Sequence, residues 1–163
     1  MKKLVFLALS VSLFFTSQAQ VKTPAPSPLQ TIKQDFGLGT LEVSYSRPAV
    51  KGRKIFGDLV PFGNVWRTGA NSATTLTFSD EVSIGGVKIA PGKYGLLSIP
   101  NKDNWTIIIS KQTDVTSPAA YKQEMDIVRI NAATADLKYK IENFAIVIDN
   151  IKSNQCEIGL YWD

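Results

Sequence analysis

Hydrophobic and polar residues alternate along most of the chain from Thr40 onward, with the period of two that is typical of β-strands. The alternation is strict over residues 41–46. Residues 144–148 instead form a continuous apolar run, which suits a strand covered on both faces. The same reasoning predicts further strands over residues 74–79, 82–84, 87–89, 94–99, 105–109, 127–131 and 156–162.

Turn signals separate these segments. Gly85-Gly86 is typical of a two-residue hairpin, and Pro91-Gly92 and residues 101–104 mark further turns. Only residues 117–124 favour a helix, because Ser117 can cap it and Pro118 can occupy its first position; it would have one or two turns. We therefore predict an all-β, antiparallel β-sandwich-like single domain (jelly-roll or Greek-key) with about seven to nine strands and at most one short helix.

The first 19 residues have the pattern of a secretory signal peptide. Lys2 and Lys3 precede an apolar run over residues 4–15, and small residues lead to a cleavage site near Ala19. The apolar run is shorter than the roughly 20 residues that span a bilayer, so no membrane span is expected in the mature protein. We predict a signal peptide over residues 1–19, a Pro-rich spacer over 20–33 and a β domain over 34–163, exported to the periplasm or the medium.

The composition excludes many kinds of active site. The chain has no histidine and one cysteine, so it cannot build a Ser-His-Asp triad, a histidine zinc centre or an internal disulfide. No cofactor and no metal site are therefore expected. Removal of Lys2 and Lys3 lowers the formal net charge from +4 to +2, and the basic residues are scattered, which argues against a nucleic-acid partner. The oligomeric state stays open.

The segment from Ser46 to Asn71 differs from the rest of the chain. It is rich in glycine, proline, basic residues and aromatic residues, with Asp58 as its one acid. Arginine beside tryptophan can hold a carboxylate, phosphate or sugar, because the guanidinium gives a bidentate fork and the ring a stacking face. The candidate ligand-binding residues are Arg47, Arg53, Trp66, Arg67, Asn71 and Tyr94.

Each of these residues also has a structural interpretation. The arginines can instead bind loop carbonyls or pair with Asp58, Glu42 or Asp126, and Trp66 can cap the edge of the core. For Tyr94 the preferred interpretation is a corner-type tyrosine that hydrogen-bonds to the backbone. Cys156 lies on the apolar face of its predicted strand, which favours a small buried hydrophobic residue over a nucleophile.

Four blocks of the sequence resemble the signature of domain-of-unknown-function family 2911 (DUF2911), whose members are small exported bacterial proteins. The blocks are Ser46-Arg47-Pro48 to Phe56-Gly57, Leu59 to Asn71 with its Trp66-Arg67-Thr68-Gly69 core, Pro91-Gly92-Lys93-Tyr94, and Asp126-Ile127-Val128-Arg129. The resemblance implies no activity, substrate or catalytic residue. Members usually continue past the position of Trp162 with another strand-like stretch, so we expect the chain to be either naturally short or truncated at Asp163.

Three functions are consistent with these observations. The favoured hypothesis is a non-catalytic exported binding module with a site for a small anionic or polyhydroxy ligand. The first alternative is a histidine-free, glycosidase-like hydrolase, which would use two of the carboxylates of Glu42, Asp58 and Asp126, with Arg67 stabilising charge. The second alternative is a structural envelope protein that associates through its sheet edges.

Overall fold

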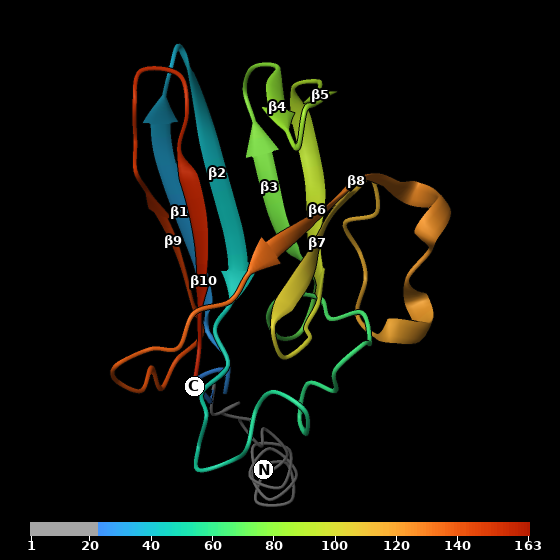
Figure 1. Ribbon diagram of the computed structural model, residues 1–163, viewed down its shortest axis with the longest axis vertical. Helices are drawn as coiled ribbons and strands as arrows, with labels where there is room; N and C mark the ends of the chain where they lie inside the picture. Colours follow the sequence, from blue (N-terminus) through green and yellow to red (C-terminus); the bar gives the residue numbers. More distant parts are fainter. Residues whose placement is uncertain (1–22) are drawn as a thin grey trace, which may run out of the picture.

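The computed structural model describes residues 23–163, so the predicted signal peptide lies outside the described part of the chain. This part folds into strands joined by turns and by one long irregular segment between the second and third strands (Figure 1). The strands are β1 (Leu29–Phe36), β2 (Gly39–Ser46), β3 (Thr74–Phe78), β4 (Val82–Ile84), β5 (Val87–Ile89), β6 (Gly92–Ile99), β7 (Asn104–Ser110), β8 (Asp126–Ala133), β9 (Ala145–Asp149) and β10 (Glu157–Tyr161).

Six of these strands form the main sheet, in the order β1-β2-β3-β6-β7-β8, and every neighbouring pair is antiparallel. The alternation predicted for β2 is observed, because Leu41, Val43 and Tyr45 are buried on one face while Glu42 and Ser44 are half-buried on the other. Between β7 and β8 the register shifts by one residue near Ile109 and Ser110, which is a β-bulge at the start of β8.

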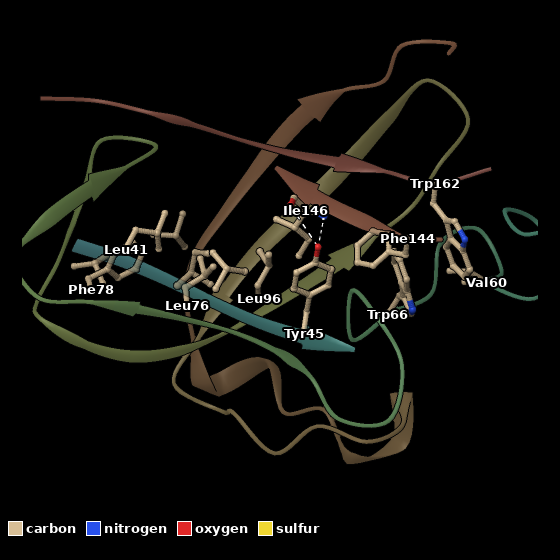
Figure 2. Close-up of a cluster of buried hydrophobic side chains, with 14 of the residues drawn as sticks. Leu41, Tyr45, Val60, Trp66, Leu76, Phe78, Leu96, Phe144, Ile146 and Trp162 are labelled. Atoms are coloured by element: carbon tan, nitrogen blue, oxygen red, sulfur yellow. Dashed lines mark hydrogen bonds between the residues drawn. The ribbon is translucent and has the colours of Figure 1, made fainter. Parts of the chain in front are cut away.

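A second layer covers part of this sheet. β9 and β10 pair as an antiparallel hairpin, which Figure 1 shows running alongside β1 and β2, and β4 and β5 form a separate small hairpin. Side chains of β9 and β10 pack against the inward face of the main sheet, as in a β-sandwich. Figure 2 shows the resulting elongated core, with Leu41 and Phe78 at one end and Trp66 and Trp162 at the other.

The prediction of an all-β, antiparallel, sandwich-like domain is confirmed. The helix expected over residues 117–124 is replaced by two single turns of 3₁₀ helix, η2 (Pro118–Ala120) and η3 (Gln123–Met125), with Pro118 at the first position of η2. In the described part of the chain, no helix is long and apolar enough to cross a membrane.

Strand β1 was not predicted from the sequence pattern. Its inward positions are half-buried and are occupied by Gln30, Ile32, Gln34 and Phe36, so polar and apolar residues share the inner face. Gln30 is tolerated there because its side-chain oxygen accepts a hydrogen bond of 2.7 Å from the Tyr45 hydroxyl. The strand therefore lacks the hydrophobic alternation that reveals the others.

Candidate functional site

The long segment between β2 and β3, residues 47–73, is anchored to the main sheet at Trp66. Trp66 and Ser98 form an isolated antiparallel bridge, in which the two N–H···O hydrogen bonds measure 2.7 and 2.9 Å. Trp66 itself is buried, and its indole N–H donates to the Gly69 carbonyl at 3.0 Å. The bridge pairs with β6 just beyond the residues that pair with β3, and it fixes the backbone that carries the neighbouring Arg67.

A network of buried hydroxyls holds the residues after Trp66. Thr68 has a positive φ of 52° and is fully buried, and its hydroxyl lies 2.9 Å from the hydroxyl of Ser98. The Thr74 hydroxyl donates to the Thr68 carbonyl, and the Thr74 N–H donates to the Arg67 carbonyl. A β-branched residue in the left-handed region is strained, so these hydrogen bonds offset an unfavourable backbone conformation.

Aromatic rings gather around Trp66. The stacked pair Trp66–Trp162 has its ring centroids 5.7 Å apart at an angle of 15°, and Phe144 meets both rings edge-on. Phe56 packs edge-on against Trp66, Trp105 and Trp162. We call Phe56, Trp66, Trp105, Phe144 and Trp162 the aromatic cluster. Edge-to-face and offset-stacked geometries are the favourable ones for aromatic pairs, so the cluster gives one end of the core a defined shape.

Beside this cluster lies a cavity of about 330 Å³, which we call the Arg67 cavity. Arg53, Trp66 and Arg67 line it, together with Trp162 and the proline-rich turns of the long segment. The full lining is Ser27, Pro48, Arg53, Leu59, Val60, Pro61, Asn64, Val65, Trp66, Arg67, Gly69, Ala70, Ser117, Pro118 and Trp162. It contains two arginines and no carboxylate, so its electrostatic character is positive.

Two buried nitrogen donors on this lining have no hydrogen-bond partner within the described residues. They are Nε of Arg67 and Nε1 of Trp162. Nη1 of Arg67 donates to the Thr116 carbonyl at 2.8 Å, which holds the guanidinium against the connection between β7 and β8. A buried unpaired donor costs about 1–3 kcal/mol, and native proteins contain few of them. Both donors belong to residues that line the Arg67 cavity, which makes this cavity the candidate site.

Arg53 lies at the exposed side of the Arg67 cavity. Its Nε donates to the Val50 carbonyl at 3.0 Å and its Nη2 to the Ala49 carbonyl at 2.6 Å, so the side chain is held by its own loop. Nη1 makes no hydrogen bond within the described residues. The structure thus brings together three of the residues selected from the sequence, namely Arg53, Trp66 and Arg67.

The other three selected residues lie elsewhere. Nε of Arg47 donates to the Phe144 carbonyl at 2.9 Å, which ties the long segment to the start of β9. Nδ2 of Asn71 donates to the Ser46 hydroxyl and to the Ser27 carbonyl. The Tyr94 hydroxyl donates to the Ala90 carbonyl at 2.8 Å, which is the contact of a corner-type tyrosine. None of the three belongs to the lining of the Arg67 cavity.

The three carboxylates considered for a hydrolase are also dispersed. Glu42 lies on the outer face of β2, opposite Lys33 and Thr77 in the sheet register, and Asp58 lies exposed in the long segment. Asp126 begins β8, where its Oδ2 accepts hydrogen bonds from Tyr121 and Arg129. No group of three or more potential metal ligands occurs within residues 23–163.

Trp162 is the functional candidate that the sequence analysis missed. It is 6% exposed and follows β10, far along the chain from Trp66. The alternating pattern of residues 156–162 places it on an apolar face, which predicts a core residue and says nothing about its indole nitrogen. Only the packing of the hairpin over the long segment reveals that this nitrogen is buried without a partner.

Comparison with known proteins agrees with the blocks recognised in the sequence. A family model described as "Protein of unknown function (DUF2911)" matches residues 27–163, which include β1 as well as every later strand. No curated protein and no solved structure matches the chain. Because the family model covers most of the chain, from before β1 to Asp163, the protein belongs to the DUF2911 family.

Proposed function

We propose that this protein is a non-catalytic binding module that takes a small anionic molecule into the Arg67 cavity. The observation that carries the proposal is that Arg67 and Trp162, which both line one cavity, each have a buried nitrogen donor without a partner among the described residues. A ligand oxygen that accepts from either nitrogen would remove a desolvation cost that the free protein bears.

The charge of the lining favours an anion over a neutral sugar. Arg53 and Arg67 are both present and no carboxylate faces them across the cavity. A guanidinium binds a carboxylate through two parallel hydrogen bonds, which are stronger than bonds between neutral groups. Asn64 and Ser117 also belong to the lining and can bond to hydroxyl groups of the same ligand.

The size of the cavity restricts the ligand further. Its volume of about 330 Å³ is near the lower end of the roughly 300–1,000 Å³ that is typical of small-molecule sites. The proposal therefore specifies a small carboxylate or phosphate, with or without hydroxyl groups. A polymer could enter the cavity only by its end group.

A thermal-shift comparison of related probes tests this proposal. We expect glucuronate and inorganic phosphate to raise the Tm of the mature protein, because ligands that bind only the folded state stabilise it. Glucose is the matched neutral control for glucuronate, and we expect it to raise the Tm less. A result in which no anion raises the Tm, or in which glucose acts as strongly as glucuronate, contradicts the proposal.

Two substitutions locate the binding site. Arg67→Lys keeps the charge but removes the planar fork, and we expect it to weaken anion binding about tenfold to a hundredfold, which corresponds to about 1.5–3 kcal/mol. Trp162→Phe removes the unpaired N–H but also shrinks a buried ring that stacks on Trp66, so it should weaken binding and also lower the Tm of the free protein. Arg129→Lys, on β8 outside the cavity lining, is the control. Equal affinity for wild type and Arg67→Lys would exclude this site.

We also propose that the protein acts outside the cytoplasm, because residues 1–19 have the composition of a signal peptide. Expression of the full chain in a Gram-negative bacterium, followed by N-terminal sequencing of the periplasmic fraction, tests this. The expected product begins near Gln20. Recovery of the protein in the cytoplasm with Lys2 and Lys3 still present would overturn the proposal.

A further inference from the structure

The second layer of the sandwich is much narrower than the first. Two strands, β9 and β10, face a main sheet of six. Where the hairpin covers the sheet, inward residues such as Val43 and Leu76 are fully buried. On β7 and β8, the inward residues Ile107 and Ile130 are only half-buried, although they pack against the same core. The apolar inner face of the sheet therefore continues beyond the part that the hairpin covers.

Between these strands and β10 lies a second cavity, of about 810 Å³, which we call the inter-sheet cavity. Its floor is apolar and includes Leu96, Ile107, Ile109 and Ile130 of the main sheet. Ile158 and Leu160 of β10 form the facing wall. The volume lies within the roughly 300–1,000 Å³ of sites for small molecules, and apolar cavities favour apolar occupants over water.

Segments outside the two sheets surround the inter-sheet cavity, so it is a concavity and not a flat sheet face. The β4–β5 hairpin contributes Ser83 to Gly85, and the chain after β8 contributes residues 134–137. Phe56 and Phe62 from the long segment also belong to the lining. Figure 1 shows the β4–β5 hairpin at the upper end of the main sheet, while β6 and β7 join at the lower end. The lining thus extends along the strands from one end of the sheet to the other.

The charged and amide groups of this lining all come from segments outside the strands. They are Asn101, Lys102, Asp136 and Asp163. Lys102 and the segment after β8 are joined at one end of the cavity, because the Thr134 hydroxyl donates to the Lys102 carbonyl at 3.3 Å. The charged residues are one lysine and two aspartates, and the rest of the lining is mostly apolar. Such a lining is complementary to an aliphatic chain that carries a polar end group.

We propose that the inter-sheet cavity binds a single aliphatic chain, with its polar end group beside Lys102. This site is distinct from the Arg67 cavity, because only Trp162 belongs to the lining of both. A second function for the protein would then be the sequestration or transport of an apolar molecule. Because the lining is concave, a single aliphatic chain fits it better than the surface of a second copy of the protein.

The single cysteine provides a direct measurement of occupancy. Cys156 belongs to the lining of the inter-sheet cavity and is half-buried, and the chain has no other cysteine. The probes are laurate, kept below its micelle concentration, and the neutral 1-dodecanol, kept below its solubility limit. We expect both probes to slow the modification of Cys156 by N-ethylmaleimide in the folded protein. Mass spectrometry measures the fraction of protein that is modified at each time. If neither probe slows the modification at saturation, the proposal is wrong.

Substitutions separate the cavity from nonspecific binding. Ala132 belongs to the cavity lining on β8, whereas its neighbour Asn131 is exposed and outside the lining. Ala132→Trp should fill the space and abolish protection by laurate, while Asn131→Trp should leave protection intact. Lys102→Gln should weaken laurate binding up to about fivefold and leave dodecanol unaffected, because it removes a partly solvated charge contact. Unchanged protection in Ala132→Trp would overturn the proposal.

Solution size gives the final test. One outcome is a ligand-free dimer in which Cys156 is already shielded and which Ala132→Trp abolishes. That outcome would mean that a second copy of the chain occupies the cavity, and the aliphatic-chain proposal would fail. If the ligand-free protein is a monomer whose Cys156 becomes protected only on addition of laurate or dodecanol, the proposal is supported. Neither outcome depends on the Arg67 cavity, so glucuronate serves as the control ligand that leaves Cys156 reactive.

Discussion

At the scale of single residues, the three-residue cluster around Asp126 has a direct electrostatic consequence. The Tyr121 hydroxyl and Nη1 of Arg129 both donate to Oδ2 of Asp126. The β-bulge at the start of β8 brings Asp126 and Arg129 to the same side of the strand, although they are three positions apart. Burial, and secondly the hydrogen bond to Asp126, raise the pKa of Tyr121 to about 12.

This raised pKa predicts a loss of stability in alkali. The protonated phenol is favoured in the folded state. Its contribution to the free energy of unfolding is therefore fully present below the ordinary tyrosine pKa of 10.0 and is lost as the pH rises through about 12. We expect the unfolding free energy of the wild type to fall more steeply above about pH 10 than that of Tyr121→Phe. Denaturant titrations at a series of pH values measure this. Parallel curves for the two proteins would refute the assignment.

At the scale of elements, the backbone from Trp66 to Asn71 depends on the hydroxyl pair Thr68 and Ser98. Thr68→Val keeps the shape and the β-branching but leaves the buried Ser98 hydroxyl without its partner at 2.9 Å. We expect a loss of about 1–3 kcal/mol in the free energy of unfolding. Chemical denaturation of Thr68→Val, Ser98→Ala and the double variant measures the coupling. Strictly additive effects would show that the two hydroxyls do not interact.

The sequence predicted elements wherever one face of a strand is uniformly apolar. β2 was predicted because Leu41, Val43 and Tyr45 alternate with polar residues, and β1 was not, because Gln30 and Gln34 share its inner face. Composition alone identified the long segment as the place to search. It could not reveal that Arg47 and Asn71 bind backbone and hydroxyl groups, because those partners come from other parts of the chain.

The candidate site shows the same limit. Arg53, Trp66 and Arg67 are close in sequence, so a shared cavity was a reasonable expectation, and all three line the Arg67 cavity. Trp162 reaches that cavity only through the packing of β10 over the main sheet. A contact between residues so distant in the chain leaves no trace in periodicity or composition, and a single sequence carries no covariation to reveal it.

At the scale of the whole molecule, one tyrosine joins the two layers of the sandwich. Tyr45 of β2 is 2% exposed, and its hydroxyl accepts a hydrogen bond of 2.9 Å from the backbone N–H of Ile146 in β9 (Figure 2). The same hydroxyl donates to Gln30 of β1, so it connects three strands. This arrangement couples the position of the β9–β10 hairpin to the main sheet.

Removal of this hydroxyl should loosen the hairpin. We expect Tyr45→Phe to lower the free energy of unfolding by about 1–3 kcal/mol, because the Ile146 N–H is left buried and unpaired. The rate of amide hydrogen exchange should increase more in β9 and β10 than in β6 and β7. Tyr94→Phe, which removes a more exposed hydroxyl bonded to Ala90, is the control and should cost less. Equal losses for the two variants would contradict this role of Tyr45.

The position of the aromatic cluster has an optical consequence. Trp66, Trp105 and Trp162 are all the tryptophans of the chain, and they lie together in that cluster, with Trp162 on the wall of both cavities. The ultraviolet-excited emission of the protein therefore arises from one location, where energy passes readily between neighbouring indoles. A change in its wavelength or intensity reports on the boundary between the two cavities, without any attached dye.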